Sequence, residues 1–249
     1  MRGGHRLISE FTEFSYGFAV TYELVLENSG SVFAAPEFPS LIREGQVGGG
    51  YDVRLDFGNF LFLQFKLSEF MRGGLSGQSN VIGLPYYRFW ITPRRQSQQH
   101  RLLVDLQNTG QQIYYAAPIF HRQAVFNTEF QARTVVNRSA FFTPSEIGNL
   151  EDDESHCVVF NDTQAYFCSE PKQLRLHTGI SMKQFLGSRM QAVKAASTVE
   201  LALRLRNLVG AVTDQVPVLS ESSVSEALTF ISFVAHVFFH CEVFFVPAL

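Results

Sequence analysis

Residues 51–67, YDVRLDFGNFLFLQFKL, restrict the possible folds more than any other part of the chain. They predict two extended segments that meet near Gly58 and Asn59. Side chains alternate between the two faces of a strand, so residues two apart share a face. On the second segment, one apolar face therefore holds Leu61, Leu63, Phe65 and Leu67.

The opposite face of this segment ends in Gln64 and Lys66, after Phe60 and Phe62. A lysine is almost never fully buried unless it is paired. Asp52, on the preceding segment, is its natural partner. A carboxylate, an amide oxygen and an amine on adjoining strands can hold a divalent cation and handle a proton. The blander interpretation is that Asp52 caps a turn while Lys66 pairs with Glu69 or Asp56 on the surface.

Composition limits the class of protein. A chain of 249 residues with 46% hydrophobic and 17% charged residues has the core of a globular protein. Its formal net charge of −3 provides no overall basic field for nucleic acid, so any phosphate-binding surface must be local. Arg88, Arg94 and Arg95 are the candidates for that surface. Three cysteines make no disulfide framework, which favours a cytoplasmic location.

Residues 9–28 predict the first helix, with Ser9 as its cap. Phe11, Phe14, Phe18 and Val25 recur at helical spacing and are expected to form its core face. Another side of the same helix carries Thr12, Tyr16, Ala19, Glu23 and Glu27, with Glu13 at its flank.

Further along the chain, we expect a strand at Tyr86–Ile91, a helix over 97–108 and a buried strand over 112–120. Helical patterns dominate residues 121–136 and 181–212. Between them, residues 157–160 and 165–168 predict a hairpin. The apolar stretch 223–249 predicts a buried helix, or a helix at an oligomer interface. It does not predict a membrane span, because His236, His240 and Glu242 interrupt it.

The predicted order is a helix with glutamates, a strand with Asp52, a strand with Gln64-x-Lys66, a helix and a strand. This order resembles the PD-(D/E)XK phosphodiesterase superfamily, the restriction-endonuclease-like nucleases. Gly50-Tyr51-Asp52-Val53 and Leu63-Gln64-Phe65-Lys66 carry the likeness. It spans roughly residues 9–120 and implies an α/β fold with an α-β-β-β-α-β core and a mostly helical C-terminal part. We accordingly expect a nuclease-like core at 1–125 and a second region at 126–249.

The resemblance also implies roles for individual residues. Members of that superfamily bind Mg²⁺ (or Mn²⁺) through the Asp and the residue two before the Lys, which here are Asp52 and Gln64. Lys66 would stabilise charge on phosphorus or help to deprotonate water. Because the Gln64 amide is neutral, a carboxylate from the first helix would strengthen the metal site. Glu23 is the preferred residue, with Glu13 and Glu27 as alternatives.

The function expected from this resemblance is a metal-dependent nuclease that acts on DNA, in prokaryotic anti-phage defence or DNA processing. The acidic net charge favours a homo-oligomer or a partner subunit, docked through the apolar C-terminal region. The polar residues within that region favour no membrane association. The alternative is a catalytically inactive nuclease fold that binds nucleic acid or a protein.

Other candidate sites are weaker. His156, Cys157, Cys168 and His177 lack the paired spacing of zinc ligands, so we expect core cysteines and surface histidines. His121 follows a strand end, where it could reach a phosphate. The chain has no glycine-rich phosphate loop, serine elbow or dinucleotide fingerprint, which argues against NTPase, serine-hydrolase and dehydrogenase functions.

Overall fold

The fold was analysed in a computed structural model. It describes residues 6–27, 58–73, 77–169, 171–188, 195–211, 213, 223–239 and 242–247. Within these residues the protein is a mixed α/β structure built on two sheets.

Within the described residues, the first sheet has five strands, and β2 lies inside it between β5 and β11. β2 runs parallel to β5 and antiparallel to β11, while β5 and β6, and β6 and β10, are antiparallel. β5 is apolar on both faces, as expected for a strand with a parallel neighbour inside a covered sheet. In sheet order, the strands are β10 (His177–Thr178), β6 (Ser139–Phe142), β5 (Gln112–Pro118), β2 (Gly58–Phe65) and β11 (Glu242–Pro247).

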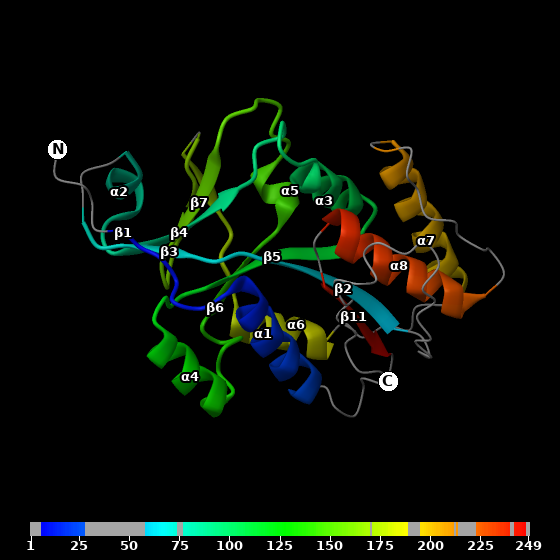
Figure 1. Ribbon diagram of the computed structural model, residues 1–249, viewed down its shortest axis with the longest axis horizontal. Coiled ribbons are helices and arrows are strands. Elements are labelled where there is room, and N and C mark those ends of the chain that lie inside the picture. Colours follow the sequence, from blue (N-terminus) through cyan, green and yellow to red (C-terminus); the bar gives the residue numbers. More distant parts are fainter. Residues whose placement is uncertain are drawn as a thin grey trace.

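Helices cover both faces of this sheet (Figure 1). One face packs against α1 (Glu13–Glu27), α4 (Gln123–Ala132) and α6 (Gly179–Ser188). The other packs against α3 (Gln99–Asn108), α7 (Ala195–Gly210) and α8 (Val224–Phe239). The short α5 (Pro144–Ile147) lies against α3.

In the part of the chain that the structure describes, the second sheet has six strands, all antiparallel to their neighbours. The short helix α2 (Gly77–Ile82) lies against two of them, β7 and β8. In sheet order, the strands are β1 (Arg6–Leu7), β3 (Glu69–Met71), β4 (Tyr86–Ile91), β7 (His156–Phe160), β8 (Ala165–Phe167) and β9 (Lys172–Leu174).

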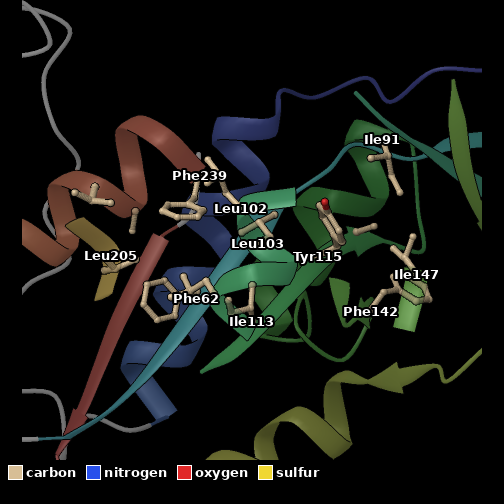
Figure 2. Close-up of a cluster of buried hydrophobic side chains, with 14 of the residues drawn as sticks. Phe62, Ile91, Leu102, Leu103, Ile113, Tyr115, Phe142, Ile147, Leu205 and Phe239 are labelled. Atoms are coloured by element: carbon tan, nitrogen blue, oxygen red, sulfur yellow. The ribbon is translucent and has the colours of Figure 1, made fainter. Parts of the chain in front are cut away.

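The largest apolar core contains side chains of both sheets and of α3, α7 and α8, and Phe89 and Phe142 join the sheets by direct ring contact. Figure 2 shows how side chains from separate parts of the chain meet there. The alternation predicted for residues 58–67 is confirmed within the described side chains. Phe62 belongs to this large core, whereas Leu61, Leu63 and Phe65 belong to a second core under α1.

Local sequence explains where two of the helices begin. The hydroxyl of Thr12 accepts a hydrogen bond from the Ser15 N–H at 3.1 Å, so Thr12 caps α1, not Ser9 as expected. Ser223 caps α8 in the same way, accepting from the Glu226 N–H at 3.1 Å. The Ser-x-x-Glu spacing is typical of a helix start.

The predicted core face of α1 is wrong for Phe14 and Phe18, which are 68% and 45% exposed. The helix instead buries the side that carries Tyr16, Ala19 and Val20. Both sides are apolar in sequence, but the small residues of the buried side permit a closer approach to the sheet. Phe11, just before the helix, is buried as expected.

The C-terminal prediction of a single helix over 223–249 is also wrong. After α8 the chain forms β11, which pairs with β2 from Gly58 to Leu63. The run EVFFV is rich in β-branched and aromatic residues, which favour a strand. Periodicity alone does not separate a buried helix from a buried strand in so apolar a stretch.

The two regions expected at 1–125 and 126–249 are interleaved. β5 and β2 from the first lie side by side between β6 and β11 from the second. The buried residues of α8 pack into the large core of their own chain. An oligomer contact through the C-terminal region stays a prediction, and these buried residues lie outside any such surface.

Gly17 provides a test of how α1 packs on β2. A Cβ atom added at Gly17 would lie 2.8 Å from Cδ2 of Phe65, whose side chain is buried. Alanine is the better helix former by ~1 kcal/mol, but overpacking costs ~1–3 kcal/mol. We expect Gly17→Ala to lower the free energy of unfolding in urea, despite the better helix propensity.

Gly77→Ala is the matched control, because nothing lies within 4 Å of an added Cβ at the start of α2. This control should leave the stability unchanged or slightly higher. A Gly17→Ala protein as stable as the wild type would contradict the close packing of α1 on Phe65.

Candidate functional site

Gln64 lies near the C-terminal end of β2 and is buried. Its side-chain Nε2 donates to the carbonyl of Phe65 at 3.1 Å, and its Oε1 accepts from Nε2 of Gln99 at 2.8 Å. A buried amide that lacks partners costs free energy, so these bonds fix the position of the Gln64 carbonyl oxygen.

Gln99 connects three parts of the chain at the first turn of α3. Its Nε2 donates both to Gln64 and, at 2.9 Å, to the carbonyl of Phe239 at the end of α8. Its Oε1 accepts from Nζ of Lys66 at 3.4 Å. The amide of Gln64 and the amine of Lys66 therefore meet through Gln99, a residue that the sequence analysis did not single out. The sequence signal of Gln99 is weak, because it is one of several glutamines around the start of α3.

Glu13 is the glutamate of α1 that faces Lys66. Desolvation by surrounding atoms raises the pKa of its carboxyl group, while the charge of Lys66 and the backbone N–H of Leu67 act in the opposite direction. The residue as a whole remains exposed, so water on its open side limits the size of this rise. An accessible carboxylate thus lies within the electrostatic reach of the ammonium group.

Glu23, the metal ligand preferred from sequence, has surroundings different from those of Glu13. Its two carboxylate oxygens accept the backbone N–H groups of Val135 and Val136 at 2.6 and 2.8 Å. Burial raises its pKa despite these bonds. Glu27 forms an ion pair with Lys183. The structure therefore brings Glu13, rather than Glu23 or Glu27, to Lys66.

The remaining predicted ligand, Asp52, lies outside the described residues. Among the described residues, no three His, Cys, Asp or Glu side chains converge as a metal site. Among the described residues of the site, Gln64 and Gln99 offer amide oxygens and Glu13 offers a carboxylate. These donor types suit Mg²⁺, and a complete protein ligand set there also needs Asp52.

The predicted phosphate-binding arginines differ in their surroundings. Arg88 is committed to an internal network, since its guanidinium bonds Glu69 at 2.6 Å and Gln78 at 2.9 Å and lies 4.7 Å from the Trp90 ring. Arg94 and Arg95 are exposed in the loop that leads into α3. Glu69, considered above as a surface partner of Lys66, instead pairs with Arg88 and Arg6.

A second basic surface was indicated by sequence only through His121, and its arginines were not predicted. A cavity of about 760 Å³ is lined by Arg6, Arg72, Arg122 and His121, among others. Nε2 of His121 is buried and has no hydrogen-bond partner, while its ring stacks on Phe70 with centroids 4.6 Å apart. The four residues come from three separate segments, so no local cluster of charges in the sequence predicts the cavity.

His100 holds the start of α3 in place. Its Nε2 lies 2.7 Å from the carbonyl of Gly148 and its Nδ1 lies 2.8 Å from the hydroxyl of Tyr115. A carbonyl only accepts, so Nε2 carries the proton and Nδ1 accepts from Tyr115. Burial lowers the pKa of this imidazole, because the charged form loses its hydration.

No protein-family model matches the chain, and comparisons with curated proteins and with solved structures find no match either. Among the described residues, no helix has the length and apolar character needed to cross a bilayer. The function of this chain is therefore inferred from the residues of the site.

The protonation of His100 can be tested directly. Its folded pKa is lowered below the ordinary value of 6.5, so it contributes stability above that pH and loses it as the pH falls. We expect nitrogen-15 NMR of the folded protein to show an imidazole protonated at Nε2 that stays neutral below pH 6.5. Each pKa unit of lowering corresponds to about 1.4 kcal/mol of stability lost in acid.

In urea unfolding, the wild type should therefore lose more stability than His100→Phe between neutral and mildly acidic pH. Both proteins share the other titrating groups, so the difference between their changes in unfolding free energy reports the titration of His100. A His100 ring that titrates at or above its ordinary pKa would contradict the buried, neutral arrangement.

Proposed function

We propose that this chain hydrolyses phosphodiester bonds of nucleic acid, with DNA as the favoured substrate. The observation that carries the proposal is that Gln99 joins the ammonium of Lys66 to the fixed amide of Gln64 at the C-terminal end of β2. The charge of Lys66 also acts on the carboxylate of Glu13.

The order of elements supports the proposal. A helix, α1, precedes the strand with Gln64 and Lys66, and the chain then passes through α3 to β5, which is parallel to β2. A parallel pair with a helical crossover is what the resemblance to restriction-endonuclease-like nucleases leads one to expect at this point. β3, α2 and β4 are inserted before α3.

The chemistry assigns a role to each group. Lys66 stabilises negative charge that develops on the phosphoryl oxygens. Glu13 offers a carboxylate oxygen for a divalent cation. Gln64 and Asp52, with Glu13, would hold Mg²⁺ or Mn²⁺. When bound, such an ion lowers the pKa of coordinated water and neutralises phosphate charge.

The basic cavity supports an extended substrate. Residues 6–13 run beside residues 66–72, as the β1–β3 pairing and the Ser9–Ser68 hydrogen bond show. Arg72 is six residues from Lys66, so extended chain places the cavity roughly 20 Å from the proposed reaction centre. Phosphates further along a nucleic acid could bind there while one phosphodiester lies at Lys66.

A second candidate function has its own support. Gln64 is neutral, buried and bonded within the protein, which is also what a structural residue would show. A nuclease-like scaffold that binds nucleic acid through the basic cavity without cleaving it fits this arrangement.

A cleavage assay separates the two functions. Labelled single- and double-stranded DNA and RNA would be incubated with the protein and Mg²⁺ or Mn²⁺. We expect cleavage by the wild type. The rate for Lys66→Met should be reduced by about 100-fold or more, because charge stabilisation at the reaction centre is lost. Glu13→Gln and Asp52→Asn should be similarly impaired.

Two matched controls accompany these variants. Lys172→Met removes an exposed lysine from the other sheet, and Glu23→Gln removes the carboxylate that holds Val135 and Val136. Both should cleave at the wild-type rate per folded molecule. Wild-type cleavage by Lys66→Met would overturn the site. Binding without cleavage in either metal would establish the second candidate instead.

A further inference from the structure

Two cysteines lie opposite each other across the β7–β8 hairpin. The register pairs Val158 with Phe167, so Cys157 directly opposes Cys168 at the next position. The Cys168 N–H donates to the Cys157 carbonyl at 3.1 Å, which confirms this register beyond the end of β8. Hydrogen-bonded antiparallel partners have Cα atoms ~5.5 Å apart, within the range that a disulfide spans.

A neighbouring cross-strand pair holds the hairpin in this register. Nδ1 of His156 lies 2.5 Å from the hydroxyl of Ser169, one position beyond the cysteines. Asp152 fixes the other side of the ring, 2.6 Å from Nε2. Successive side chains alternate between faces, so the two cysteines share the face opposite to His156 and Ser169.

The two thiols have different surroundings. Cys157 is buried and its sulfur accepts from Nε2 of Gln78 at 3.2 Å, whereas Cys168 is partly accessible. The hydrogen bond between the two thiols lowers the pKa of Cys168, helped by the charge of Arg88, and raises that of Cys157. The proton is therefore held on Cys157, and Cys168 is the group that becomes the thiolate.

We propose that Cys157 and Cys168 form a reversible two-electron oxidation site whose co-substrate is a hydroperoxide. The Cys168 thiolate attacks the O–O bond of hydrogen peroxide, which gives a sulfenic acid and hydroxide. The Cys157 sulfur then attacks the Cys168 sulfur, and water leaves as the disulfide forms. In sum, two thiols and one hydrogen peroxide give one disulfide and two waters.

This site is independent of the proposed hydrolytic function. The cysteines belong to the six-stranded sheet, whereas Gln64 lies in the five-stranded sheet. Transient, redox-sensing disulfides are compatible with a reducing compartment. Loss of cleavage activity in the assay above would not bear on the cysteine pair, and failure of disulfide formation would not bear on the nuclease.

The test uses the full chain with Cys241→Ser, so that Cys157 and Cys168 are its two thiols. The folded protein would be treated with hydrogen peroxide, alkylated and analysed by intact mass and by a non-reducing digest. We expect both thiols to disappear without uptake of oxygen, a peptide that links Cys157 to Cys168, and full reversal by dithiothreitol.

Two further variants show the order of events. With Cys168→Ser, the remaining Cys157 should react with peroxide at least about ten-fold more slowly, because it is buried and keeps its proton. With Cys157→Ser, Cys168 should take up oxygen and remain unlinked. Circular dichroism checks that each variant is folded. Oxygen uptake without linkage in the protein that carries both cysteines, or linkage between molecules alone, would overturn the proposal.

Discussion

The hydrogen bond between Gln64 and Gln99 is the interaction on which the candidate site depends. It joins the end of β2 to the start of α3, and Gln99 extends it to the last turn of α8 and to Lys66. A buried polar network of this kind is stable when its members are bonded and costly when one is removed. The same bonds that stabilise the junction also hold an amide oxygen and an amine in place.

The junction exists because β2 has neighbours on both sides. β5 places α3 over one face, and β11 brings the C-terminal segment against the same strand after α8 has packed into the core. The C-terminal half is therefore part of the site's support, since it supplies the Phe239 carbonyl. A helix on the opposite face, α1, presents Glu13 from the other side of the sheet.

Much of the fold was predictable where sequence periodicity is unambiguous. The strand Tyr86–Ile91 and the β7–β8 hairpin are confirmed, as are the helix near 97–108 and the alternation of β2. Prediction was wrong where two alternative helix faces, or a helix and a strand, are both apolar in sequence. Phe14 and Tyr16 compete for the core side of α1, and the periodicity of the apolar C-terminal stretch does not separate a buried helix from a buried strand.

The site was predictable to a smaller extent. Gln64 and Lys66 follow from strand alternation, and Glu13 was one of three glutamates that spacing alone did not separate. Gln99 and the cavity of Arg6, Arg72 and Arg122 depend on contacts between distant segments, which no local pattern encodes. Asp52 lies outside the described residues, so its part in the site stays a prediction.

The most direct test of the central claim is manganese binding followed by NMR of side-chain amides. Mn²⁺ is paramagnetic and broadens signals from nuclei near it. If the end of β2 holds the cation, the amide groups of Gln64 and Gln99 should broaden at low Mn²⁺ concentration, while that of Gln164, in the other sheet's β7–β8 turn, stays sharp. Unchanged Gln64 and Gln99 signals, or equal broadening of all three, would contradict a metal-dependent site there.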